Sequence, residues 1–141
     1  MIPNVQDVIP QRYPFQLIDT FTDVQPGQAA TARKLITINE WFFAGRPANH
    51  LTMPRPLLIE ALAQTGVAAV LCLPEFAGDD VLFGGIRDAQ FNDSVRPGDV
   101  LTLHVVLEKI KRPFGLGHGQ IIRAGEVVVD AQLILAITGK E

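Results

Sequence analysis

Apolar residues recur at every second position over two stretches of the C-terminal half, 101–107 and 127–135. This period of two is typical of strands that bury one face. Including their flanks and two further stretches, we expect strands over 81–91, 99–111, 115–125 and 126–138, with a turn at the Gly-rich start of the third, "GLGHGQ". The short breaks "RPGD" and "AGE" predict hairpin or meander connections between successive strands.

The N-terminal third predicts a short helix followed by a β-hairpin. "PNVQDVIP", at 3–10, begins with proline and has apolar residues at roughly helical spacing. Residues Phe15–Val24 and Ala29–Ile38 predict two strands, because the "QPGQ" between them is a Pro-Gly turn that suits antiparallel pairing.

One segment, "PRPLLIEALAQTGVAAVLCL" at Pro54–Leu73, is long enough for a major helix, with Pro56 in its first turn and Pro74 after its end. It is apolar on nearly every side. Glu60 and Gln64 lie one helical turn apart within it, which favours a buried helix wrapped by a sheet over a membrane span. The order of elements predicts a single α+β domain over 1–141, with an antiparallel sheet around one long central helix.

Composition supports one well-packed globular domain: of 141 residues, 48% are hydrophobic and 19% charged. The net charge of -3 argues against a nucleic-acid-binding surface. A single cysteine, Cys72, excludes an intrachain disulfide, and the first residues lack the pattern of a signal peptide, so we expect a cytoplasmic protein. We expect no metal site, because the three histidines share no ligand-like spacing with each other or with Cys72.

The acidic side chain inside the long apolar segment is the first candidate for chemistry. An ionisable group in such a run is costly unless it is paired or used. Glu60 is therefore either a functional carboxylate or a buried acid satisfied by local hydrogen bonds.

Four blocks in order carry a family resemblance: "IPQRYPFQLID" from Ile9, "NEWFFAG" from Asn39, "MPRPLLIEALAQTG" from Met53 and "FNDSVRPGDVL" from Phe91. Together they resemble the 3-hydroxyacyl-acyl-carrier-protein dehydratases of the hot-dog fold. The resemblance implies a curved sheet around one helix, a homodimer or higher even oligomer, and an acyl thioester on acyl carrier protein or coenzyme A as substrate. It implies no cofactor, no nucleic acid and no insertion into a membrane.

The same resemblance assigns the site. In the family, a histidine and a carboxylate from different subunits remove water from a 3-hydroxyacyl thioester in a tunnel at the dimer interface. Glu60 matches the carboxylate. Counting back fourteen positions to the place of the family's histidine gives Arg46. A guanidinium stays protonated and cannot act as a base, so this substitution implies weak or lost dehydration.

Two further positions near the helix start depart from the family pattern. The usual Pro-Gly before the helix is Pro54-Arg55, so the backbone N–H that would polarise the thioester carbonyl belongs to Arg55, whose side chain crowds the approach. Gln11 replaces a histidine in the early motif, which we interpret as a structural change.

Another histidine is a candidate substitute for the missing base. His50 lies four residues beyond Arg46 on the same predicted loop, and the alternative for it is an exposed loop residue. For His104, on a predicted strand, and His118, in the Gly-rich "GLGHGQ" turn, we expect exposure or local hydrogen bonds. Arg46 has two open roles: an ion pair with Glu60 across the interface, or a contact to a phosphate or carboxylate of a ligand.

Two larger groups of residues are candidates for substrate contacts. The expected tunnel lining, for which core packing is the alternative, is Phe42, Phe43, Met53, Gln64 and Phe91. The basic residues that would attract an acidic carrier protein, for which a solvated surface is the alternative, are Arg33, Lys34, Arg87, Lys109, Lys111 and Arg112.

Three functions therefore remain open. The first is a dehydratase-family protein in fatty acid or related lipid biosynthesis. The second is a hot-dog thioesterase that uses Glu60 alone. The third is a non-catalytic, thioester-binding partner subunit of an active dehydratase.

Overall fold

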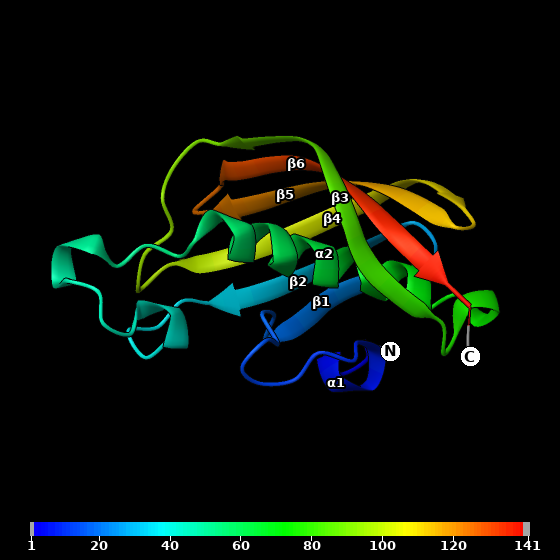
Figure 1. The fold of residues 1–141 in the computed structure, drawn as a ribbon, viewed down its shortest axis with the longest axis horizontal. Coiled ribbons are helices and arrows are strands. Elements are labelled where there is room, and N and C mark those ends of the chain that lie inside the picture. Colours follow the sequence, from blue (N-terminus) through cyan, green and yellow to red (C-terminus); the bar gives the residue numbers. More distant parts are fainter. Residues whose placement is uncertain (1, 140–141) are drawn as a thin grey trace.

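The computed structural model describes residues 2–139. Its helices and strands form one α+β domain, a six-stranded sheet with one long helix (Figure 1). The elements are α1 (Val5–Val8), β1 (Thr20–Gln25), β2 (Ala29–Leu35), η1 (Trp41–Phe43), η2 (Ala48–His50), α2 (Arg55–Leu71), η3 (Pro74–Phe76), β3 (Asp80–Phe91), β4 (Val100–Lys111), β5 (Phe114–Arg123) and β6 (Glu126–Thr138).

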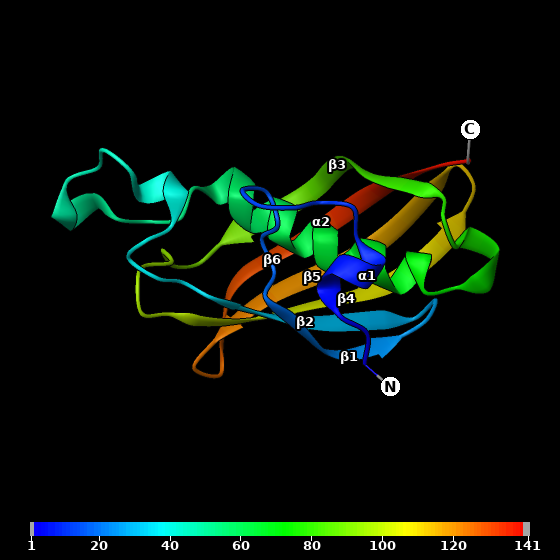
Figure 2. The same ribbon diagram turned by 90° about the horizontal axis from the view of Figure 1, so that it is seen from below.

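All strand pairs are antiparallel, in the order β1-β2-β4-β5-β6-β3. The sheet curves around α2, which lies against its concave face (Figures 1 and 2). One prediction about connections is wrong: the "RPGD" break joins β3 to β4, and these strands are not neighbours. β3 pairs with β6 instead, so the 92–99 connection crosses from one sheet edge to the interior of the strand order.

Most predicted elements are confirmed with shifted ends. The long helix is shorter at each end, running Arg55–Leu71, and the short helix is a single turn within 3–10. The first hairpin strand begins only at Thr20, because residues before it are bound by a side chain of α2. His118 was expected in a turn; it lies inside β5, and the turn that follows this strand is at Ala124 and Gly125.

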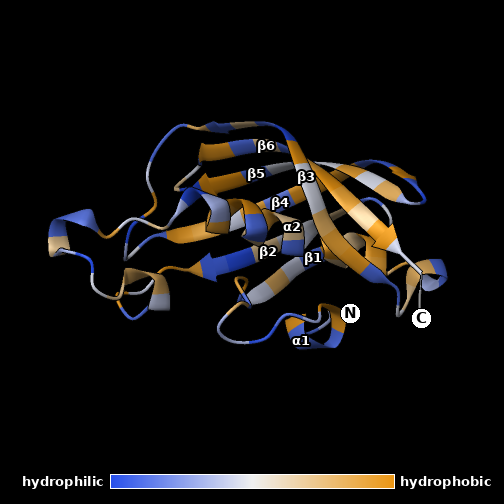
Figure 3. Cartoon of the chain, viewed as in Figure 1, coloured by the Kyte–Doolittle hydropathy of each residue, from blue (hydrophilic) through white to orange (hydrophobic). Residues whose placement is uncertain are grey.

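Close packing between α2 and the sheet depends on two residues without side chains. A Cβ built on Gly119 of β5 would lie 3.2 Å from Leu62 Cδ1, and one built on Gly66 of α2 would lie 3.1 Å from Val105 Cγ1. The inward residues of the central strands, such as Leu103 and Val105, have no exposed surface. Figure 3 shows hydrophobic and hydrophilic positions following one another along β4, β5 and β6, and the burial pattern along β4 places the hydrophobic ones on the helix side.

The chain between β2 and α2 forms an extension at one end of the molecule. It contains η1 and η2, and both ribbon views show it projecting beyond the N-terminal end of α2 (Figures 1 and 2). Its last residues return to the body through a hydrogen bond from Met53 N to Val95 O, 2.8 Å long. The start of α2 is therefore joined to the 92–99 connection.

Candidate functional site

Glu60 lies in the second turn of α2, half-buried in a helix that is largely apolar. Its Oε1 accepts a hydrogen bond from Gln64 Nε2 at 3.3 Å, the contact expected for side chains one turn apart. Burial raises the pKa of the Glu60 carboxyl above its ordinary value, and the hydrogen bond from Gln64 opposes this only in part. A carboxyl with a raised pKa is suited to donate a proton near neutral pH.

Gln64 donates to the Glu60 carboxyl and is itself held in place by backbone groups. The residue is 1% exposed, and its side-chain amide donates to Phe15 O at 2.8 Å and accepts from Leu17 N at 2.9 Å. A buried amide with these partners cannot rotate without leaving backbone groups unpaired. The same contacts hold residues 15–17 against α2, which explains why β1 starts later than the sequence pattern predicts.

The N-terminus of α2 presents a free backbone donor. The first N–H groups of a helix have no acceptor within it, and Pro56 lacks an N–H altogether. Among residues 2–139 the Arg55 N–H donates to no backbone group, while those of Leu57 and Leu58 both reach Pro54 O. The Arg55 guanidinium lies 4.8 Å from the centre of the Phe91 ring, so its charge is held over the end of β3.

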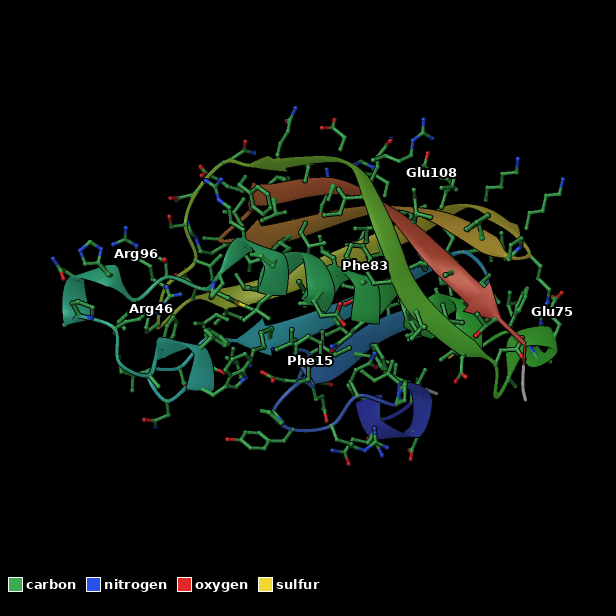
Figure 4. The ribbon with its side chains drawn as sticks, in the orientation of Figure 1. Phe15, Arg46, Glu75, Phe83, Arg96 and Glu108 are labelled. Atoms are coloured by element: carbon green, nitrogen blue, oxygen red, sulfur yellow. The ribbon has the colours of Figure 1, made fainter. Side chains whose placement is uncertain are left out.

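Arg46 and His50 lie on the projecting segment and not beside Glu60. Arg46 is exposed and donates from Nη1 to Thr52 O at 3.1 Å, and Figure 4 shows it beyond the N-terminal end of α2. His50 is exposed at the end of η2. Within residues 2–139, neither makes a hydrogen bond or ion pair to Glu60. Within a single chain, the Glu60 carboxylate is therefore separate from the segment that carries Arg46 and His50.

The expected tunnel residues divide between the interior and the surface of this chain. Phe42, Phe43 and Met53 are nearly inaccessible, at 7%, 5% and 3% exposed, and the two phenyl rings pack edge to face with centroids 4.8 Å apart. Phe91 is half-buried under the Arg55 guanidinium. Gln64 is buried and bound as described. Contact of these side chains with an acyl chain stays a prediction.

The other histidines are both held by local hydrogen bonds on the outer face of the sheet. His104 Nδ1 is 2.8 Å from Thr31 Oγ1, and His118 Nε2 is 2.8 Å from Asp130 Oδ1. Asp130 also accepts from Gln120 Nε2 at 2.9 Å, and these two hydrogen bonds lower the pKa of its carboxyl. In the described part of the chain, no group of His, Cys, Asp and Glu side chains is arranged to hold a metal ion.

A proton donor, a free N–H at a helix start and an apolar surrounding are the parts that activate a thioester carbonyl and protonate a leaving group. Comparison with known proteins shows the family of the chain. The model of the FabA-like domain matches residues 9–137. The chain belongs to the FabA-like family.

Among its curated relatives in this family, a protein of Chloroflexus aggregans named 3-hydroxyacyl-[acyl-carrier-protein] dehydratase FabZ is 44% identical over 137 residues, 97% of this chain and 95% of that protein. The protein of that name from Ligilactobacillus salivarius is 45% identical over 136 residues, 96% of this chain and 97% of the relative.

Solved structures share the hot-dog fold of this FabA-like chain. The dehydratase heterocomplex ApeI:P from Xenorhabdus doucetiae matches with a TM-score of 0.78 and 21% identity, over 99% of this chain and 94% of that one. A hypothetical thioesterase with coenzyme A from Streptococcus pneumoniae matches with a TM-score of 0.65 and 14% identity, over 86% of each chain. At these identities the likeness concerns the fold alone. No helix in residues 2–139 is long and apolar enough to cross a membrane.

Proposed function

We propose that the protein binds 3-hydroxyacyl thioesters on an acyl carrier protein, and that it eliminates water from them slowly because Arg46 stands where its relatives' base is expected. The observation that carries the proposal is Glu60, a carboxyl with a raised pKa that accepts a hydrogen bond from Gln64 inside a largely apolar helix. The curated relatives match nearly the whole chain and are named as 3-hydroxyacyl-[acyl-carrier-protein] dehydratases, which supports the same substrate class.

The reaction breaks a C–H bond beside the thioester carbonyl and a C–O bond at the next carbon, with a C=C bond formed and water released. Glu60 would give its proton to the leaving hydroxyl. The Arg55 N–H would stabilise negative charge on the carbonyl oxygen as the first proton leaves. That proton needs a base, which a guanidinium cannot be near neutral pH, so in the natural protein a water molecule must accept it and the step is slow.

A second subunit would complete the site. β3 is an edge strand, paired only with β6 among the described strands, and it exposes Leu82, Phe83 and Ile86 at 55%, 37% and 46%. A long edge with apolar side chains is a template for pairing with another chain. The projecting segment could then bring Arg46 or His50 to the partner's Glu60, so we propose a homodimer or a higher even oligomer.

A basic surface that would suit an acidic carrier protein lies on the outer side of the sheet. A groove of about 570 Å³ has an apolar floor that includes Phe114, Leu116 and Ile134, and its basic members are Arg87, Lys109, Lys111 and Arg112. Arg112 pairs with Asp79, whereas no carboxylate in residues 2–139 lies at ion-pair distance from the other three. Lys34 is unsuitable, because it is 7% exposed and pairs with Glu40.

The test is an assay of enoyl product from a 3-hydroxyacyl carrier protein, with the natural protein and with Arg46→His and Glu60→Gln. We expect Arg46→His to raise the rate by about two orders of magnitude or more, because it restores a group that accepts protons near neutral pH. Glu60→Gln in the same background should abolish the gain. Strong activity of the natural protein that disappears in His50→Ala would instead identify His50 as the base and contradict the proposal.

Hydrolysis of the thioester is a second candidate, favoured by the position of Glu60 on α2, which does not depend on the projecting segment. A carboxylate can act in thioester hydrolysis as base or nucleophile without a histidine. Release of free thiol without enoyl product, lost in Glu60→Gln, would identify hydrolysis. If neither product forms, a test for binding to a histidine-bearing dehydratase relative would examine the role of a non-catalytic partner subunit.

A further inference from the structure

Arg123, the last residue of β5, holds the connection between β3 and β4 at several points. Its Nη1 donates to Ser94 O at 2.7 Å and to Asp99 Oδ2 at 3.0 Å, and its Nη2 pairs with Asp93 Oδ2. The side chain is 23% exposed and Asp99 is 22% exposed, so this part of the network is largely shielded from water. A planar guanidinium that reaches three acceptors fixes them relative to one another in a way that a single ammonium cannot.

The held connection is otherwise an irregular segment, residues 92–99, with no helix or strand of its own. Asp99 Oδ2 also accepts from Arg96 N at 2.9 Å, and Gly98 N donates to Ile36 O at 2.8 Å. Val95 lies between the points that Arg123 holds, with its side chain wholly buried. The position of the Val95 carbonyl is therefore set from both sides.

That carbonyl leads directly to the candidate site. Val95 O accepts from Met53 N at 2.8 Å, and Met53 is followed by Pro54 and by Arg55, whose N–H is the free donor at the start of α2. Thr52, on the other side of Met53, accepts the hydrogen bond from the Arg46 guanidinium. The 92–99 connection also lies at the same end of the molecule as the start of α2 (Figure 1).

We propose that Arg123 is a positioning residue: by holding Asp93, Ser94 and Asp99 it fixes Val95 O. Through Met53 it then sets where the Arg55 N–H lies relative to Glu60 and where Arg46 lies relative to the partner's Glu60. The guanidinium acts only through this chain of contacts and touches no reacting atom. The kinetic part of the inference rests on the proposed function, whereas the structural part does not.

The structural part is tested by amide hydrogen exchange in Arg123→Gln, Arg123→Lys and the natural protein. Loss of the charge-assisted hydrogen bonds should make the Met53 amide exchange about ten times faster in Arg123→Gln, with a smaller effect in Arg123→Lys. Arg12→Gln is the matched control, because Arg12 also makes three hydrogen bonds, to the carbonyls of Ile9, Gln11 and Gln6. Unchanged exchange at Met53, or an equal increase in Arg12→Gln, would overturn the proposal.

The kinetic part is tested by adding the same substitutions to Arg46→His, in which the missing base is restored. We expect Arg123→Gln to lower kcat about ten- to a hundred-fold through misplaced groups, with KM for the carrier-bound substrate nearly unchanged and partial rescue by Arg123→Lys. A fall in kcat accompanied by a rise in KM, with no recovery in Arg123→Lys, would mean general damage to the fold and contradict the proposal. If Arg46→His is itself inactive, the proposed function fails, and Met53 exchange alone decides whether Arg123 sets the position of the segment.

Discussion

At the scale of single residues, the candidate site depends on one carboxyl that is costly to keep. Glu60 is half-buried, and its pKa is raised because burial disfavours the charged form. A group whose pKa is higher in the folded than in the unfolded state binds its proton more tightly when folded. It therefore lowers stability as pH rises from the unfolded pKa through the folded one.

Glu60→Gln should consequently make the protein more stable at pH 7.5 than the natural chain, and only slightly more stable at pH 4, where the carboxyl is mostly protonated in both states. The amide keeps the size of the side chain and a hydrogen-bond acceptor for Gln64, but cannot ionise. Urea unfolding at the two pH values measures the difference. A variant that is less stable at pH 7.5 would mean that the ionised Glu60 is paired in the folded protein, contrary to the raised pKa.

Glu60 is recognisable in the sequence as a candidate, but the groups that hold it are not. An acid within an apolar run is visible in the chain itself, and so is its neighbour Gln64, but the partners of Gln64 are backbone groups of residues 15 and 17. Nothing in those side chains marks them. The contacts of Arg123 were missed for the same reason, because its acceptors lie 24 to 30 residues away along the chain.

At the scale of elements, the local patterns predicted each long strand and the helix. A strand buried on one face shows alternating apolar residues, and a helix buried on all faces shows a continuous apolar run. They did not predict that β3 leaves β4 and pairs with β6, since the choice of neighbour depends on how the sheet closes around α2. The glycines of "GLGHGQ" suggested a turn, yet two of them line the inner side of β5, where α2 and β4 approach closely.

Gly119→Ala tests that close approach. The added methyl group would meet Leu62 at 3.2 Å, and overpacking of this kind typically costs about 1–3 kcal/mol. Gly115→Ala is the matched control on the same strand, because its nearest atoms are 3.7–3.8 Å away, an ordinary contact distance. We expect chemical denaturation to show a loss of stability for the first variant and little change for the second. Equal effects would mean that strand conformation, and not helix packing, selects glycine here.

At the scale of the whole molecule, a net charge of -3 coexists with a basic groove on the outer face of the sheet. If an acidic carrier docks there, the double substitution of Lys109→Glu and Lys111→Glu should weaken its binding about tenfold or more, mainly through slower association and most strongly at low salt. Arg33→Glu makes the control, because Arg33 is exposed on β2 and outside the groove. Calorimetric titration with acyl carrier protein at two salt concentrations measures the change. Equal weakening by Arg33→Glu would indicate a diffuse attraction and no defined docking site.

The two edges of the sheet differ in a way that bears on assembly. β1 is six residues long and mostly polar at its exposed positions, whereas β3 has twelve residues and exposes Leu82, Phe83 and Ile86. A polar, short edge discourages pairing, and a long apolar one promotes it.

We therefore predict a dimer that joins through β3, with Ile86→Lys shifting it toward monomer at about 1 µM, since a lysine at a buried contact must lose its hydration. Thr22→Lys, on the β1 edge, should leave the dimer intact. Sedimentation velocity distinguishes these outcomes, and a natural protein that is monomeric at the same concentration would contradict both the assembly and the completion of the site by a second copy.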